Sequence, residues 1–125
     1  MVNDTADGPA LGFPPSARLR RRAEFQRVQA RGQRLVLTHF IVFVHRTGGA
    51  HSARLGITVS KKVGHAPIRS RWKRLVREAF RRLRPELAPG LDIVVIGRPG
   101  VPEPDFDVVG HALRGALLRT RQRDR

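Results

Sequence analysis

The 125-residue chain contains no cysteine, and its 10 acidic residues are far outnumbered by 25 Lys and Arg residues. The absence of cysteine excludes disulfides, thiolate metal sites and a cysteine nucleophile, and it fits a reducing, cytoplasmic location. No apolar run approaches the length of a transmembrane helix, so no membrane-spanning helix is expected. The N-terminal residues lack a basic region followed by an apolar block and therefore do not predict a secretory signal. The length fits one domain with a single hydrophobic core.

The sequence also lacks the motifs of common catalytic and metal sites. It contains no HExxH, GxSxG or P-loop pattern, and its five histidines show no metal-ligand spacing. Glu103, Asp105 and Asp107 lie close together, but a Pro-rich loop before a helix makes capping their expected role. We therefore predict no catalytic residue and no metal site in the protein, which disfavours a nuclease with its own active site.

Positive charge is the most prominent feature of the composition. The formal net charge is +15, the sequence pI is about 12.0, and all but three of the basic residues are arginine. Such a charge attracts polyanions, nucleic acid first and anionic membrane second. Arginine suits nucleic acid because its guanidinium group forks onto phosphate and stacks on bases. A GC-rich genome would also favour arginine codons, so the preference for Arg over Lys is not specific by itself.

The pattern of turns and apolar residues predicts one domain. Residues 1–17 are expected to be disordered, residues 18–120 to form the domain itself, and residues 121–125 to be a basic tail. LRRRAEFQRVQARG predicts a short helix that Gly32 ends. LVLTHFIVFVH is expected to be one long strand that pairs with ARLGITVS as in a hairpin, and LDIVVIGR is expected to be a third strand. A last helix follows, capped by Asp105 or Asp107.

The best-defined element is a helix over residues 67–83. Its apolar residues recur at the 3.6-residue period and form one stripe, and Pro67 suits the first turn. Between residues 61 and 84 there are ten basic residues and one acidic residue, Glu78, which is expected to offset Arg74 and Arg82 one turn away. An ordinary solvated face would carry charges of both signs. A helix lying on a membrane would leave its apolar stripe free to enter lipid, whereas this stripe is needed to cover strands. Binding of a polyanion is therefore favoured.

The segment VSKKVGHAPIRSRWKRLVREAFR (residues 59–81) resembles the signature of the bacterial ribonuclease P protein subunit. In that family a strand ends in Ser-Lys-Lys, a Gly turn follows, and an Arg-Asn-Arg helix begins. LRRRAEFQRVQARG, RLGITVSKK and DIVVIGRP also resemble the family, and the resemblance spans roughly residues 18–118.

The resemblance implies an α+β fold: a single-domain α/β sandwich in the order αβββαβα, with a left-handed βαβ crossover through the basic helix. It implies the protein subunit of an endoribonuclease whose RNA, with Mg²⁺, removes the 5′ leader of precursor tRNA. The partners would be the catalytic RNA and that leader, with no further protein required. The residues that would bind the catalytic RNA are Lys61, Lys62, Arg69, Ser70, Arg71, Lys73, Arg74 and Arg77. Phe25 and Phe43 would bind the leader, although a helical Phe25 also suits a place in the core.

Three residues depart from the family pattern. Ser70 replaces the usual Asn, Pro67 stands where a β-branched residue is usual, and Gln29 stands where a second helix aromatic often occurs. A shorter hydroxyl at position 70 loses an amide that both donates and accepts hydrogen bonds. Gln29 predicts weaker stacking on the leader.

Two other classes of nucleic-acid-binding protein fit the same charge. One is a general or ribosome-associated RNA-binding protein without a part in processing. The other is a DNA-binding module, for which the sequence offers no helix-turn-helix pair.

Overall fold

A four-stranded sheet forms the centre of the computed structural model, which describes residues 14–123. In spatial order the strands are β1 (Gln33–Val36), β2 (Phe40–Arg46), β4 (Leu91–Gly97) and β3 (Arg54–Thr58). β2 runs antiparallel to β1 and β4, whereas β3 runs parallel to β4. The helices are α1 (Arg22–Arg31), α2 (Ala66–Leu83) and α3 (Phe106–Arg123), so the order along the chain is α1-β1-β2-β3-α2-β4-α3.

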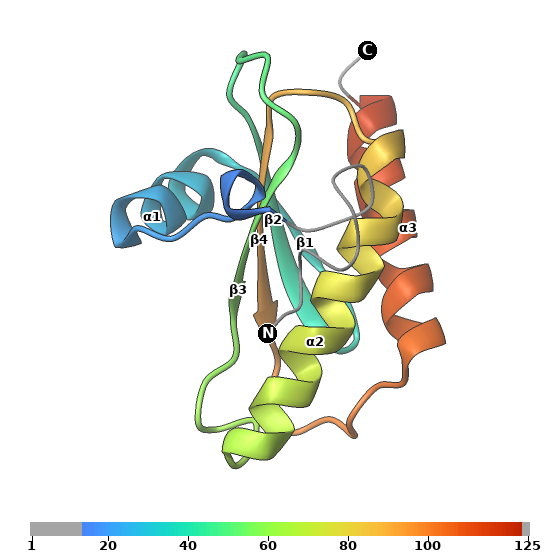
Figure 1. Cartoon of the computed structure of the whole chain (residues 1–125). Helices are drawn as coiled ribbons and strands as arrows, with labels where there is room; N and C mark the ends of the chain where they lie inside the picture. The colour runs from blue at the N-terminus through green and yellow to red at the C-terminus, as the bar shows by residue number, and fades with distance from the viewer. Residues whose placement is uncertain (1–13, 124–125) are drawn as a thin grey trace.

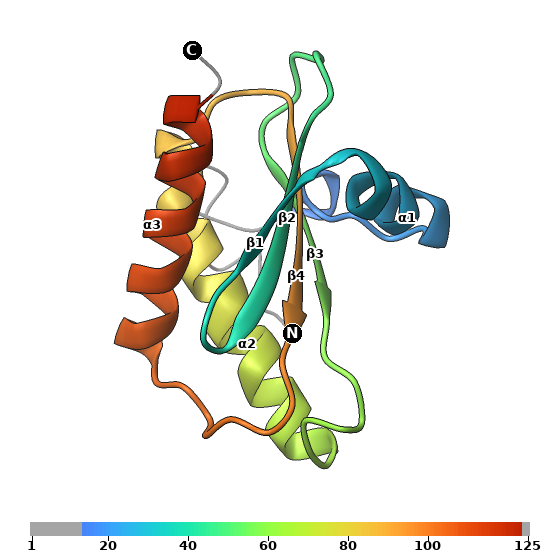
Figure 2. The same ribbon diagram turned by 180° about the vertical axis from the view of Figure 1, so that it is seen from behind.

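The helices cover the sheet unequally. α2 and α3 lie side by side on one face, whereas α1 lies alone on the other (Figures 1 and 2). The main core fills the space under α2 and α3, where Trp72, Val76 and Phe80 of α2 pack with Phe40 and other sheet residues. A smaller cluster of Leu19, Val28 and Val94 lies under α1. The predicted mixed α+β sandwich is therefore confirmed.

The prediction of one long strand over LVLTHFIVFVH was wrong. These residues form the hairpin of β1 and β2, closed by a hydrogen bond from the Leu37 amide to the Phe40 carbonyl (2.8 Å). Arg98 directly follows β4, and its guanidinium donates a hydrogen bond to the Leu37 carbonyl (2.7 Å), which stabilises the turn. The turn contains neither Gly nor Pro, and β-branched and aromatic residues flank it, so the sequence pattern predicted one continuous strand.

The predicted hairpin-like pairing of the 35–45 segment with ARLGITVS was also wrong. β4 lies between β2 and β3 and pairs with both. Parallel strands need a crossover connection, and α2 supplies it between β3 and β4. The two segments are close in sequence, which suggested that they pair directly. In the structure the connection through α2 brings β4 between them instead.

The helix predictions agree with the structure. α1 ends at Gly32, α2 begins one residue before Pro67, and both match the predicted segments. Asp105 caps α3, because its carboxylate accepts a hydrogen bond from the Val108 amide (2.9 Å). None of the helices in the described part of the chain is long and apolar enough to cross a membrane.

The described residues include both ends of the expected domain. Residues 1–13, most of the expected disordered segment, lie outside the described residues. Pro15–Ala17, however, form a short 3-10 helix in which Ala17 is fully buried, so order begins before residue 18. At the other end α3 continues to Arg123, three residues into the expected basic tail.

One ion pair is built into the sheet itself. Asp92 of β4 is only 2% exposed, and its neighbour on β3, Arg54, donates two hydrogen bonds to it (2.8 and 2.7 Å). The carboxylate raises the pKa of Arg54. His51 Nε2 lies 3.7 Å from the same carboxylate. Because Asp92 is buried, its charge depends on this guanidinium for compensation.

We predict that Arg54→Met lowers the free energy of unfolding by about 3 kcal/mol, because it leaves a buried carboxylate without its fork. The double variant Arg54→Met/Asp92→Leu should recover most of that loss, since neither charge then remains. Urea unfolding monitored by Trp72 fluorescence measures both. Arg114→Met, which breaks the exposed pair with Glu86, is the control and should change little. Equal losses in the Arg54 and Arg114 variants would contradict this account.

Candidate nucleic-acid interface

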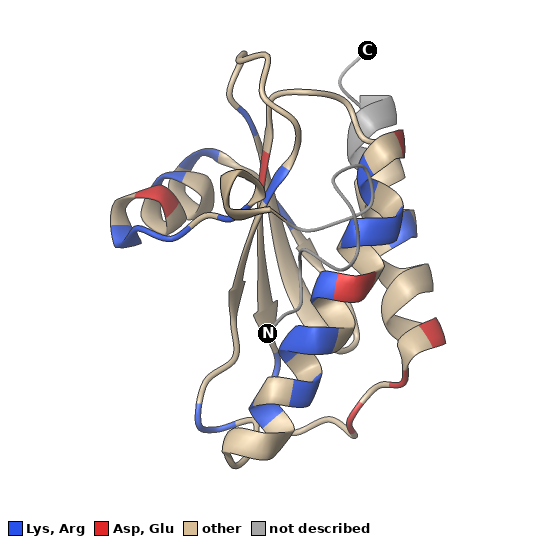
Figure 3. Ribbon diagram, in the orientation of Figure 1, with Lys and Arg blue, Asp and Glu red and all other residues tan. Residues whose placement is uncertain are grey.

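The basic residues predicted to bind RNA lie together on and just before α2. Lys61 and Lys62 are exposed in the turn that precedes the helix, where the Val63 amide donates to the Ser60 carbonyl. Lys and Arg then recur along the visible side of α2 (Figure 3). Burial of Trp72 and Phe80 against the sheet offsets the repulsion among these charges, since each large side chain contributes a few kcal/mol and each repulsive pair costs tenths.

Part of the positive charge toward the C-terminal end of α2 is offset by carboxylates within the protein. Glu78 pairs with Arg81 and Arg82, which lowers the pKa of Glu78, and Glu86 pairs with Arg114 of α3. Glu78 therefore balances Arg82, as expected, but its other partner is Arg81 and not Arg74. The carboxylates thus offset charge at the C-terminal end of α2, and the predicted RNA-binding residues lie before it, in the preceding turn and along the helix to Arg77.

The predicted RNA-binding residues of α2 fall on two sides of the helix. Arg69, Lys73 and Arg77 follow each other at intervals of four and form one row, in which Arg69 donates to the Gly64 carbonyl (3.2 Å). Arg71 and Arg74 lie on the other side and line a groove with the 103–106 segment. Ser70 is exposed.

Arg71 is not directed freely into solvent. Its guanidinium donates two hydrogen bonds to the Glu103 carboxylate (2.8 and 3.0 Å), and both side chains are substantially exposed. The interaction lowers the pKa of Glu103 and raises that of Arg71. The Glu103 carboxylate thus occupies the guanidinium donors of Arg71 that would otherwise bind a phosphate.

The other face of the sheet holds the predicted leader-binding residues. Phe25 of α1 and Phe43 of β2 are both half-buried and pack against the cluster of Leu19, Val28 and Val94. Phe43 thus lies on the opposite face from Phe40 and Val42, since successive side chains of a strand point to opposite faces. The structure brings the two phenylalanines to one surface.

A glycine allows Phe25 to lie on the sheet. Gly56 of β3 is the neighbour of Val94, and a Cβ added at Gly56 would lie 2.5 Å from the Phe25 ring. α1 is held above it by Glu24, whose carboxylate accepts hydrogen bonds from the Arg21 and Arg20 amides (3.0 and 2.9 Å). These bonds lower the pKa of Glu24, so its contribution to stability is present at neutral pH and is lost as the carboxylate protonates in acid.

Sequence reasoning missed the row of residues next to Phe43. The strand register places four residues side by side on the sheet face that α1 covers: Val36, Ile41, Ile96 and Thr58. Val36 is 53% exposed, and Ile41 and Ile96 are half-buried. Alternation from Phe43 pointed to Ile41, but β4 is apolar at every position from Ile93 to Ile96, so its faces could not be distinguished. Together with Phe25 and Phe43 this row forms an open, partly apolar surface, which we call the α1-side surface.

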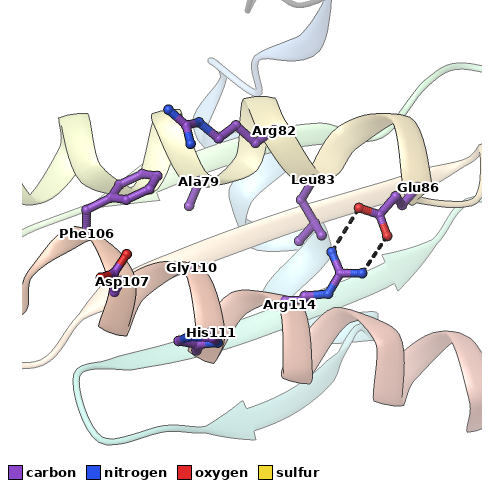
Figure 4. A pocket seen from close by; sticks show the side chains of 9 residues that line it. All are labelled: Ala79, Arg82, Leu83, Glu86, Phe106, Asp107, Gly110, His111 and Arg114. Atoms are coloured by element: carbon purple, nitrogen blue, oxygen red, sulfur yellow. Dashed lines mark hydrogen bonds and ion pairs between the residues drawn. The ribbon is translucent and has the colours of Figure 1, made fainter.

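A groove between α2 and α3 is built differently. Its volume is about 310 Å³, and Figure 4 shows Arg114 pointing to Glu86 across it. Arg82 lies over the Phe106 ring, 4.9 Å from its centroid, and is also paired with Glu78. Because these cations already have carboxylate partners, the groove resembles a helix–helix contact more than a polyanion site.

The described residues also do not fit a magnesium site. None of their side chains form a group of three or more His, Asp or Glu that could hold a metal ion.

Comparisons with known proteins agree with the resemblance in the sequence. The family profile "Ribonuclease P" matches residues 13–121. The ribonuclease P protein component of Brevibacillus brevis is 37% identical over 106 residues, which cover 85% of this chain and 84% of that protein. The component of Dictyoglomus thermophilum is 38% identical over 110 residues, covering 87% and 88%.

Solved structures show the same likeness in three dimensions. The RNase P protein from Thermotoga maritima matches with a TM-score of 0.72 and 40% identity, covering 82% of this chain and 96% of that one. The Staphylococcus aureus RNase P protein matches with a TM-score of 0.71 and 30% identity, covering 84% and 94%. With the family profile spanning most of its length, this chain belongs to the ribonuclease P protein family.

Proposed function

We propose that this chain is the protein subunit of ribonuclease P, which binds the catalytic RNA through α2 and the 5′ leader of precursor tRNA through the α1-side surface. The main support is that the two predicted sets of residues lie on opposite sides of the sheet, where two RNA segments have room to bind together. Hydrolysis would belong to the RNA with Mg²⁺, and the work would take place in the cytoplasm.

The chemistry of each surface suits its proposed RNA. A folded RNA is bound by its shape and phosphates, which an arginine-rich helix recognises without reading bases. A single strand of variable sequence needs stacking surfaces beside positive charge. Phe25 and Phe43 supply rings, and Arg20, Arg21 and Arg22 lie exposed just before or at the start of α1. Gln29, where a second helix aromatic often occurs, is exposed on α1.

The first prediction concerns cleavage of a precursor tRNA by the ribonuclease P RNA at low magnesium. Adding the protein should stimulate cleavage strongly, and Arg69→Ala/Lys73→Ala should remove most of the stimulation. Arg82→Ala/Arg114→Ala removes the same charge from residues paired with carboxylates and should retain most of it.

Two outcomes would contradict the proposal. Cleavage by the protein alone would mean that it has its own active site. Tight, salt-sensitive RNA binding without stimulation would favour the alternative, a general or ribosome-associated RNA-binding protein.

The second prediction concerns Gly56→Ala, which forces the Phe25 ring off the sheet. Affinity of the holoenzyme for precursor tRNA should fall about tenfold, since stacking on one aromatic contributes about 1–3 kcal/mol. Affinity for mature tRNA, which lacks the leader, should stay the same. Gly115→Ala is the matched control, because a Cβ there meets open space. Equal losses for both tRNAs would mean that the variant damages the fold and not leader binding.

The third prediction concerns the Arg71–Glu103 pair. Glu103→Gln should tighten binding of the catalytic RNA up to about fivefold, because phosphate no longer competes with a carboxylate for the fork. The gain should largely disappear in an Arg71→Ala background, which separates this competition from general repulsion by Glu103. Binding titrations at fixed salt measure it, with Glu86→Gln as the control. Weaker binding of Glu103→Gln would mean instead that Glu103 orients Arg71 for RNA.

A further inference from the structure

A pocket of about 240 Å³ lies at the outer edge of strand β3, where the two proposed RNA surfaces approach each other. Its lining contains three arginines from two separate parts of the chain. Arg18 and Arg20 come from the segment before α1, and Arg77 comes from α2. Phe25 and Leu55 complete much of the remaining wall.

The backbone directs the two N-terminal arginines toward this pocket. Arg18 is paired with Leu55 at the β3 edge, and the Leu19 amide donates to the Leu55 carbonyl (2.9 Å). Arg18, Leu19 and Arg20 all line the pocket, and Leu19 is also buried in the cluster under α1. The arrangement therefore follows from the way this segment extends the sheet.

The electrostatics of the wall favour an anion. None of the described residues that line it carries a carboxylate. By contrast, Glu86 and Asp107 line the α2–α3 groove, and Glu103 and Asp105 line the groove beside Arg71. Like charges gathered around a concave surface raise the local potential and attract an ion of opposite sign.

The size and chemistry of the pocket suit a phosphate group. Its volume is below the roughly 300–1,000 Å³ typical of sites that enclose a whole small molecule. Guanidinium groups bind phosphate through paired, charge-assisted hydrogen bonds. The ring of Phe25 and the side chain of Leu55 offer apolar surface on which the rest of a nucleotide can rest without being enclosed.

The position of the pocket identifies which phosphate it would take. Phe25 belongs to the α1-side surface, and Arg77 ends the row of Arg69, Lys73 and Arg77 on α2. A strand that leaves Phe25 toward α2 must pass around the β3 edge. Resting on the function proposed above, we propose that this pocket binds one backbone phosphate of the 5′ leader as it passes between the two surfaces.

The test uses precursor tRNAs that each carry a single neutral methylphosphonate in the leader, bound to the holoenzyme. With the wild-type protein, one leader position should be sensitive, and its substitution should weaken binding about tenfold, the value of one charge-assisted hydrogen bond. Arg18→Gln/Arg20→Gln should weaken binding of the unmodified precursor by a similar factor and abolish the sensitivity at that position. Arg82→Gln/Arg114→Gln, which removes equal charge from residues outside the wall that are paired with carboxylates, should keep it.

The outcomes separate this inference from the proposed function. If Arg18→Gln/Arg20→Gln keeps the sensitivity at every leader position, or weakens binding of mature tRNA as much, the phosphate site is wrong. If the wild-type protein fails to stimulate the catalytic RNA, the proposed function itself is wrong. Thermal unfolding of the variant excludes damage to the fold as the cause of lost binding.

Discussion

The burial of strand β4 on both of its faces holds the molecule together. Ile93 and Val95 enter the core under α2 and α3, whereas Val94 enters the cluster under α1. The same strand carries Asp92, whose charge is compensated by Arg54 of the neighbouring strand. Because β4 joins both layers, it fixes the position of the basic helix on one side relative to the phenylalanines on the other. The separation of the two proposed RNA surfaces depends on this strand.

The apolar stripe of α2 gives a physical answer to the concentration of arginine on one helix. Trp72, Val76 and Phe80 are buried, so the helix is held by packing and does not rely on favourable charge pairs along its surface. Toward the C-terminal end of α2, Glu78 pairs with Arg81 and Arg82 and offsets part of their charge. Just beyond the helix, Glu86 pairs with Arg114 of α3. The imbalance that remains toward the helix start is the part that a polyanion would relieve.

The sequence predicted the features that depend on local pattern. The period of α2, the stop at Gly32 and the cap at Asp105 were all readable, since each needs only neighbouring residues. Phe25 and Phe43 were named from the family resemblance, and alternation along β2 placed Phe43 on the face opposite Phe40.

The features that the sequence did not predict depend on contacts between distant segments. The β1–β2 turn lacks Gly and Pro, and β4 enters between strands that precede it in the chain. The need for glycine at position 56 comes from the Phe25 ring, which packs on it from α1. The burial of Asp92 depends on Arg54 of the neighbouring strand, a pairing that the sequence alone does not indicate. The arginines of the β3-edge pocket come from positions nearly sixty residues apart in the sequence.

The central claim is that opposite sides of the sheet bind different RNAs at the same time. Site-specific photo-crosslinking within the active holoenzyme tests it most directly, with one crosslinker at Val36 on the α1-side surface and another at Lys73 on α2. The account predicts that position 36 crosslinks to the leader of precursor tRNA and position 73 to the catalytic RNA. Crosslinks from both positions to the same RNA segment, or an exchange of the two targets, would contradict it.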